Sequence, residues 1–157
     1  MLKIHQIVVR KFLLIFVTLF IVLGGIIYYW TKALYIEQTR DSLLQSVESI
    51  SFALQDLSQL DTIAQKTKSN LQLRFTVIKE DGEVISESHK DKKTMDNHKY
   101  RAEIMQANKE GYGYIIRHSD TINKDLLYIA KQYTINNEVI YIRLSRELRS
   151  IKQEIFS

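Results

Sequence analysis

The sequence contains neither cysteine nor proline. Without cysteine it has no disulfide framework and no zinc site of the kind that depends on thiolate ligands. The absence of proline is compatible with long helices and uninterrupted strands, because proline interrupts the hydrogen bonding of both. Hydrophobic residues make up 45% of the 157 residues, which is enough for one membrane segment and a single domain of about 100–130 residues with its own core.

A large excess of charge of one sign is also missing from most of the chain. The net charge is +4, but Lys3, Arg10 and Lys11 all precede or border the first long apolar run. From Thr31 onward, 19 Lys and Arg residues stand against 18 Asp and Glu residues. A nearly neutral domain lacks the basic surface that nucleic-acid binding requires, so we predict no nucleic-acid partner.

Sequence motifs of common catalytic sites are absent. There is no GxxxxGK[ST] phosphate loop, no GxSxG nucleophile motif and no HExxH metal motif. His89, His98 and His118 can be assembled into a metal site by count, but no helical i, i+4 spacing supports one. "GYGY" at residues 111–114 follows a predicted helix and opens a strand, which favours a helix stop over a phosphate-binding loop. We therefore predict no catalytic residue, no metal site and no cofactor.

One long apolar run lies near the N-terminus. Residues 12–30, "FLLIFVTLFIVLGGIIYYW", are 19 uncharged residues and form roughly 28 Å of helix, which matches the hydrocarbon core of a bilayer. Arg10 and Lys11 precede the run, and the aromatic residues 28–30 close it at the level where such rings favour the interface. By the positive-inside rule we expect a transmembrane helix with a cytoplasmic N-terminus and residues 31–157 on the other side.

A cleaved signal peptide is the alternative interpretation of this run. Thr31-Lys32-Ala33 weakly resembles a small-residue cleavage site. The apolar run is longer than the apolar part of a signal peptide, and the lysine makes the site a poor one, so the uncleaved anchor is favoured.

An apolar stripe with 3–4 spacing predicts one long helix from about residue 32 to residue 68. Ile36, Leu43, Ile50 and Leu57 recur every seven residues along it. The stripe is too short for a sustained coiled coil. It can pack on the sheet of its own domain, on a second copy of the helix, or on each at a different height.

Strand patterns follow this helix. In "LRFTVIKEDGEVISES", residues 73–88, two β-rich runs flank Asp81-Gly82, which is the strongest short-range signal of a hairpin. A helix is then predicted to about Lys109, ended by Gly111. Three strands follow at 112–118, 125–134 and 138–144, with "INN" as the last turn. Ser145 is predicted to cap a final helix. The order predicts an α+β fold, in which a transmembrane helix continues into a long helix that packs on a roughly five-stranded antiparallel sheet.

The stretch "MDNHKYRAE", residues 95–103, precedes the middle helix and is crowded with charge. Asp96 or Asn97 is a suitable N-cap, which would place the basic residues between 98 and 101 in or near the first helical turn. Each cation is disfavoured there by about 0.3–1 kcal/mol, because the helix dipole is positive at the N-terminus. Some other group is expected to compensate the cluster.

Two kinds of anion can balance these cations. One is a structural carboxylate, for which Glu83, Glu87 and Asp120 are available. The other is an anionic ligand bound at the helix N-terminus, where free N–H groups point outward. Arg117 and Ser119, at the end of the following strand, can join either arrangement.

Three segments of the chain resemble a known family. "RFTVIKEDGEVISES", "MDNHKYRAEIMQA" and "GYGYIIRHS" are similar, in this order, to the extracytoplasmic sensor region of PhoR-type sensor histidine kinases. The resemblance implies a PAS-like or Cache-like fold. It also implies a bacterial inner (cytoplasmic) membrane protein of a two-component system. The most specific match is D-N-H-x-x-R-x-E at Asp96, Asn97, His98, Arg101 and Glu103, with Ala102 where proline is common in the family.

The resemblance covers the input half of such a kinase. The second membrane helix, the HAMP linker, the phosphoacceptor helices and the ATP-binding domain of the family are missing from this sequence. As given, the chain is therefore not expected to be an enzyme. Its domains are predicted as a cytoplasmic N-terminus (1–11), a transmembrane helix (12–30), an extracytoplasmic sensor domain (31–144) and a C-terminal helix leading toward the missing second membrane helix (145–157).

Three functional hypotheses follow. The first is the membrane-anchored signal-input portion of a sensor histidine kinase, acting as a homodimer. The family name suggests phosphate-responsive signalling without establishing that this domain binds phosphate. The second is a single-span interaction or regulatory protein that binds a membrane or periplasmic partner, and the third is the sensor region of a chemoreceptor. The residues predicted to bind a ligand, or to hold the small helix to the sheet, are His98, Arg101, Glu103, Arg117 and Ser119.

Overall fold

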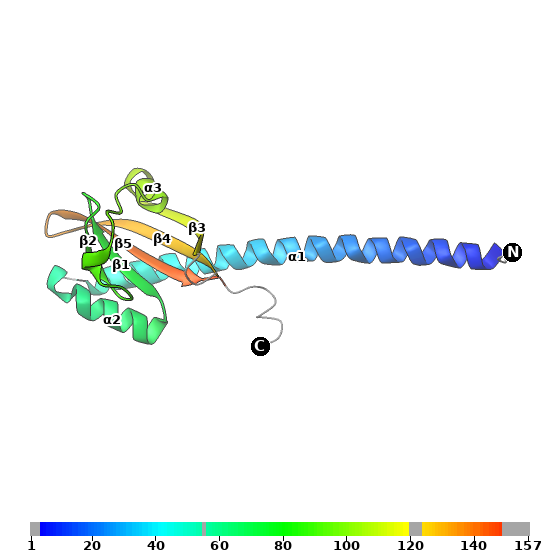
Figure 1. The fold of residues 1–157 in the computed structure, drawn as a ribbon, viewed down its shortest axis with the longest axis horizontal. Coiled ribbons are helices and arrows are strands. Elements are labelled where there is room, and N and C mark those ends of the chain that lie inside the picture. The colour runs from blue at the N-terminus through cyan, green and yellow to red at the C-terminus, as the bar shows by residue number, and fades with distance from the viewer. Residues whose placement is uncertain (1–3, 55, 120–123, 149–157) are drawn as a thin grey trace. The chain divides into compact units, whose positions relative to one another are not determined.

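A computed structural model describes residues 4–54, 56–119 and 124–148 (Figure 1). The fold is α+β, with a long N-terminal helix and an open five-stranded antiparallel sheet. Two compact units, residues 1–37 and 38–157, are described separately. The elements are α1 (Ile4–Ala53), η1 (Leu57–Gln59), α2 (Leu60–Leu71), β1 (Arg74–Lys79), β2 (Val84–Glu87), η2 (Lys92–Thr94), α3 (Ala102–Glu110), β3 (Tyr112–Ser119), β4 (Lys124–Ile135) and β5 (Glu138–Glu147).

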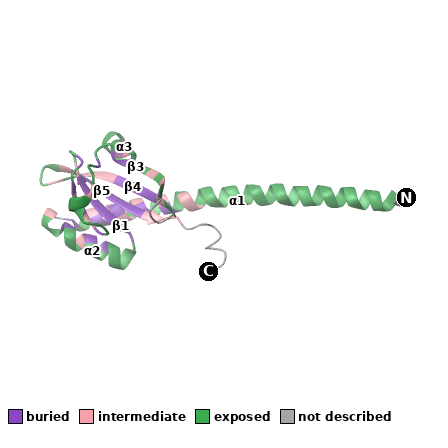
Figure 2. Ribbon diagram, in the orientation of Figure 1, coloured by how far each residue is buried: buried purple, intermediate pink, exposed green. Residues whose placement is uncertain are grey.

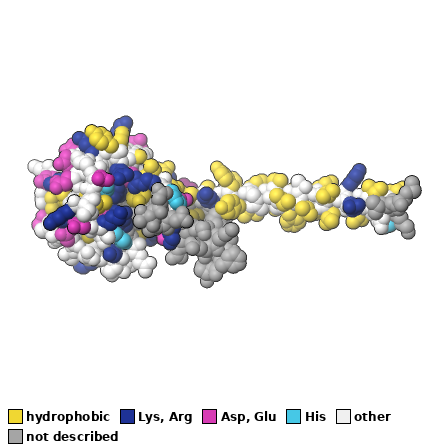
Figure 3. All heavy atoms as spheres, viewed as in Figure 1, with side chains coloured by type: hydrophobic (Ala, Val, Ile, Leu, Met, Phe, Trp, Pro, Cys, Tyr) yellow, Lys and Arg dark blue, Asp and Glu magenta, His cyan; other side chains and the backbone are white. Residues whose placement is uncertain are grey.

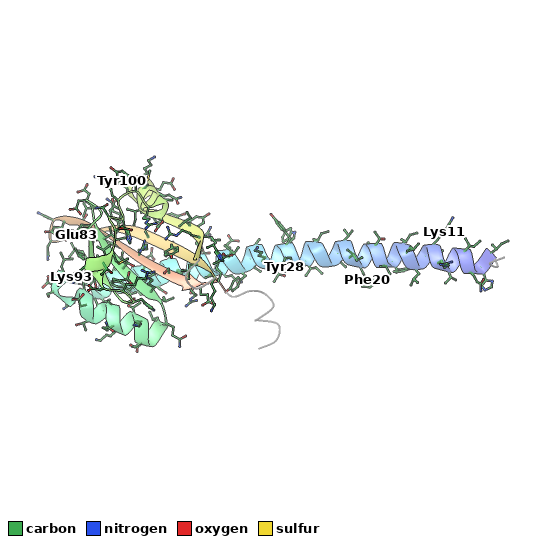
Figure 4. The ribbon with its side chains drawn as sticks, viewed as in Figure 1. Lys11, Phe20, Tyr28, Glu83, Lys93 and Tyr100 are labelled. Atoms are coloured by element: carbon green, nitrogen blue, oxygen red, sulfur yellow. The ribbon has the colours of Figure 1, made fainter. Side chains whose placement is uncertain are left out.

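The N-terminal unit is the first part of α1. Apolar side chains cover much of this part of the helix (Figure 3), and Lys11 lies near its start (Figure 4). Phe20 and Tyr28 project outward from the helix, and both are more than half exposed (Figure 4). Within the described residues, α1 is the one helix that is long and apolar enough to cross a membrane, judged by length and composition.

The sheet has the strand order β2-β1-β5-β4-β3, and every neighbouring pair is antiparallel. The Asp-Gly hairpin between β1 and β2 is confirmed, and Gly82 in its turn has a φ of 92°. The predicted turn between the last two strands is also confirmed. Its central residues Asn136 and Asn137 have φ values of 52° and 64°, the left-handed conformation that tight hairpin turns require.

The two faces of the sheet bury separate groups of side chains, and buried residues make up much of the central strands (Figure 2). On one face, side chains of α1 and α2 pack with Phe75, Val77 and Ile142 into the larger core. On the other face, Ile104 of α3 packs with a smaller group that includes Tyr141. Alternation along each strand produces this division, because successive side chains of a strand point to opposite faces.

The apolar stripe of the first helix packs on the sheet of its own domain, as one of the predicted alternatives had it. Leu43 and Val47 are fully buried there, and Ile50 is buried beside them. The prediction of one helix to residue 68 is wrong, because α1 ends at Ala53. The Asp56 carboxylate accepts the backbone N–H of Ser58, which caps the short η1 turn and starts a new helical segment.

Two other predicted helix starts are wrong. The middle helix α3 begins at Ala102 rather than next to Asp96 or Asn97, so the basic residues 98–101 precede its first turn. Ser145 does not cap a final helix, because β5 continues through Glu147 and pairs Ser145 with Arg74 and with Tyr128. Residues 149–157 of that predicted helix lie outside the described residues.

Candidate functional site: a buried ionic network beneath a strap

Residues 95–101, here called the strap, lie across the β1–β2 turn. The backbone N–H of His98 donates to the carbonyl of Gly82 at 2.9 Å. The amide of Asn97 donates to the carbonyl of Asp81 at 2.9 Å, and its oxygen accepts the backbone N–H of Lys99 at 2.9 Å. The Asn97 side chain therefore ties the strap to the turn, which explains why it does not cap α3.

The first residue of α3 to carry a charge, Glu103, is completely buried. Its carboxylate accepts from the Arg143 guanidinium of β5 at 3.0 Å, and the Arg143 side chain is 3% exposed. Burial lowers the pKa of Arg143 below its usual value, while the adjacent Glu103 carboxylate acts in the opposite direction. The pair joins α3 to the middle of the sheet.

The ion pair extends into a network across β1 and β2. Arg143 also donates to the hydroxyl of Thr76 at 3.3 Å, and this hydroxyl donates to Glu87 at 2.9 Å. Glu87 in turn accepts from Arg74 at 3.0 Å. Positive and negative groups therefore alternate along one continuous chain of hydrogen bonds, an arrangement that strengthens each bond in a poorly solvated site.

His98 lies beside this network and is 4% exposed. Burial lowers its pKa to about 4, and the positive charges of Arg143 and Arg101 act in the same direction. Among the described residues, its Nδ1 atom has no hydrogen-bond partner, and neither has Oε2 of Glu103. Two buried polar atoms near a desolvated ion pair thus retain unused hydrogen-bonding capacity, which is costly unless it has a purpose.

The predicted site residues are partly brought together. Arg101 contributes to the charge around His98, and the Arg117 guanidinium carbon lies 4.5 Å from the centre of the Tyr128 ring. Arg143 approaches the same ring at 5.4 Å, so Arg117 reaches the network through Tyr128. Ser119 is the last residue of β3, and its side chain lies outside what the structure describes.

The buried carboxylate of the site is not one of the three that were considered as partners from the sequence. Glu83, Glu87 and Asp120 were the carboxylates considered for balancing the cations of residues 98–101, with an anionic ligand as the alternative. Instead Glu87 pairs with Arg74, Glu83 pairs with Lys79 on the surface at 3.1 Å, and Asp120 is outside the described residues. The buried carboxylate is Glu103 itself, and its partner is Arg143.

Arg143, Thr76 and Tyr128 were missed by the sequence reasoning. One signal was available for Arg143. In the strand "EVIYIRLSRE" it lies between Ile142 and Leu144, which are both buried. An arginine within an apolar strand needs a buried partner. The partner could not be identified locally, since Glu103 is 40 residues away in the sequence.

"GYGY" has two structural roles. Gly111 ends α3 with a φ of 85°, so the predicted helix stop is confirmed. Gly113 lies beneath α3, where an added Cβ would be 2.2 Å from the carbonyl oxygen of Glu103. The absence of a side chain at this position allows α3, and with it Glu103, to approach the sheet closely.

The arrangement is suited to holding a conformation, because its hydrogen bonds join α3, β1, β2 and β5. No cluster of metal-ligating side chains occurs among the described residues. The buried charges of the network make α3 and the strap sensitive to any change of protonation or hydrogen bonding.

No protein-family model matches the chain, and no curated protein matches it.

Proposed function

We propose that this chain is the membrane-anchored signal-input portion of a PhoR-type sensor histidine kinase, with a PAS-like or Cache-like sensor domain. The observation that carries the proposal is the composition of α1. One helix contains both the apolar segment of membrane-spanning length and the residues Leu43, Val47 and Ile50, which are buried in the core of the sheet domain. A change in the packing of that core therefore acts on the helix that also provides the anchor.

The family motifs support the proposal through their contacts. The Asp-Gly turn and the D-N-H segment bind each other through Gly82 and His98, and through Asp81 and Asn97. The glutamate of the motif forms the buried pair with Arg143. Motifs that are separate in the sequence thus form one interlocked unit, as expected if they are characteristic of a single domain type.

The sensor is proposed to act as a homodimer in the bacterial cytoplasmic membrane. A groove of about 540 Å³ lies between α1 and α2, lined by residues that include Ser46, Ile50 and Leu71. Leu71 is 47% exposed, so a second copy of α1 would bury apolar surface there. With α1 of the second copy bound in this groove, a change of packing in one subunit would be transmitted to the other.

The coding sequence downstream of Ser157 tests the proposal. A second apolar segment followed by a histidine box of the H-E-x-x-x-P type is expected for a sensor kinase. A stop codon, with no kinase encoded nearby, would instead support a single-span interaction or regulatory protein. A long heptad-patterned helix would support a chemoreceptor.

The membrane topology can be tested by cysteine labelling, because the chain has no cysteine of its own. We expect Lys109→Cys, at an exposed position, to react with a membrane-impermeant maleimide in intact cells. His5→Cys is the matched control and should react only after permeabilisation, because it precedes the apolar run. Labelling of position 5 alone in intact cells would show that the topology is the opposite of the proposed one. A product lacking the apolar run would identify a cleaved signal peptide.

A further inference from the structure

The strap is held to the rest of the domain by few polar contacts. Its backbone is tied to the β1–β2 turn by the hydrogen bond from His98 to Gly82 and by the Asn97 amide. Lys99 and Tyr100 are exposed, and Tyr100 projects from the surface with 80% of its area accessible (Figure 4). Within the strap, His98 is the one fully buried side chain, and Met95 is half-buried against the smaller core. Of the strap side chains, His98 is therefore the one whose position at the β1–β2 turn a change of charge can alter from a buried site.

The surroundings of His98 are unfavourable for a second buried positive charge. Arg143 from β5, Arg101 from the strap and Arg74 from β1 all oppose its protonation, and burial opposes it more strongly. Glu103 from α3 is the carboxylate that favours protonation, but it is already paired with Arg143. Glu87 of β2 is likewise paired with Arg74. The site therefore accommodates a neutral imidazole much better than an imidazolium.

We propose that the proton is a stimulus sensed by this domain, and that protonation of His98 releases the strap from the β1–β2 turn. This inference rests on the proposed sensor function and names the stimulus of that sensor. The closed strap holds neutral His98 near three guanidinium groups, and Glu103, the carboxylate that favours its protonation, is already paired with Arg143. The open strap exposes the ring to water, where its positive charge is solvated. Acid therefore favours the open state through a difference in proton affinity between the two states.

The direction and size of the effect follow from this difference. The pKa of His98 is about 4 with the strap closed, and it returns to its ordinary value of 6.5 when the ring is exposed. Above pH 6.5 both states are neutral, and the closed strap has its full stability. Between pH 6.5 and pH 4, each unit of acidification favours the open state by about tenfold. Because the pKa is lowered in the closed state, stability is lost as the pH falls.

A route leads from the strap to α1 through buried residues. Arg101 is the N-cap of α3, and Glu103 in the first turn binds Arg143 of β5. The neighbours of Arg143 in β5, Ile142 and Leu144, point to the opposite face and pack in the same core as the buried residues of α1. Release of the strap would loosen the start of α3, and then the buried pair that fixes this part of β5.

Hydrogen exchange of the full chain in lipid nanodiscs tests the proposal. The backbone amide of His98 reports the contact with Gly82, and the amide of Gln132, which donates to Gly111 at 3.0 Å, is an internal control outside the strap. After correction for the intrinsic exchange rate, the opening constant at His98 should rise about tenfold per pH unit below pH 6.5. The opening constant at Gln132 should change much less.

Two substitutions separate His98 from other titrating groups. The opening constant at position 98 should lose most of its pH dependence in His98→Gln, because the new side chain does not titrate. The matched control His89→Gln removes a histidine outside the strap and should behave as the unchanged chain. If His98→Gln does not fold, the ring resonances of His98 in the unchanged chain supply the answer, since they should titrate well below those of an exposed histidine.

Three results would overturn the proposal. The first is strap exchange that is independent of pH in the unchanged chain, and the second is the same pH dependence in His98→Gln. The third is a His98 ring that titrates at its ordinary pKa without any change in strap exchange. None of these results would bear on the membrane topology or on the downstream coding sequence. The sensor proposal is therefore tested separately, by those two measurements.

Discussion

Replacing Glu103 with alanine is expected to lower the free energy of unfolding by about 3–5 kcal/mol. The carboxylate is fully buried and holds Arg143, whose side chain is 3% exposed. Its removal leaves a guanidinium charge in a poorly solvated site, with the hydroxyl of Thr76 as its remaining hydrogen-bond partner among the described residues and no carboxylate bound to it. The cost is dominated by this unpaired buried charge rather than by the lost hydrogen bond. Urea unfolding of the full chain in detergent, followed by circular dichroism, measures it.

The surface pair formed by Lys79 and Glu83 provides the matched control. Its nitrogen–oxygen distance of 3.1 Å is close to the 3.0 Å of the buried pair, but its side chains are 41% and 60% exposed. Glu83→Ala should therefore cost less than about 1 kcal/mol. The double substitution of Glu103→Leu with Arg143→Met should recover much of the lost stability, because it removes both charges together. Similar losses for Glu103→Ala and Glu83→Ala would show that Glu103 is not buried as an ion pair.

Most of the sheet could be predicted from the sequence because its signals are local. Asp81-Gly82 specifies a tight turn by backbone conformation, and "INN" does the same between β4 and β5. Alternation of apolar residues identifies strands without any knowledge of their partners. The predicted strand ranges accordingly differ from the observed ones by a few residues at their ends.

The predictions that failed depended on contacts between distant residues. Asn97 is a good N-cap by residue type, but its side chain binds Asp81, 16 residues earlier. The helix dipole argument identified residues 95–103 as electrostatically unusual, but it could not identify Arg143 as the partner of Glu103. The length of the first helix failed for a different reason, because the Asp56 cap interrupts an apolar pattern that otherwise continues.

Replacing Gly82 with alanine is expected to destabilise the domain by about 2–5 kcal/mol, from two additive causes. Its φ of 92° is unfavourable for any residue with a Cβ, at a cost of about 1–2 kcal/mol. The added Cβ would also lie 2.1 Å from the Asn97 side-chain oxygen and 2.5 Å from the backbone nitrogen of Lys99. Because the second atom belongs to the backbone, the strap must move, and overpacking of this kind costs about 1–3 kcal/mol.

Gly111→Ala separates these two causes. Gly111 has a similar φ of 85°, but an added Cβ would meet nothing within 4 Å. It should therefore show the conformational cost alone, and the difference between the two variants measures the contact between the strap and the β1–β2 turn. The difference should be accompanied by faster hydrogen exchange at the amide of His98 in Gly82→Ala, because that amide binds the Gly82 carbonyl. Equal losses of stability in the two variants, with unchanged exchange at His98, would mean that the strap does not press on the turn, and the interlocked motifs would then lose their structural explanation.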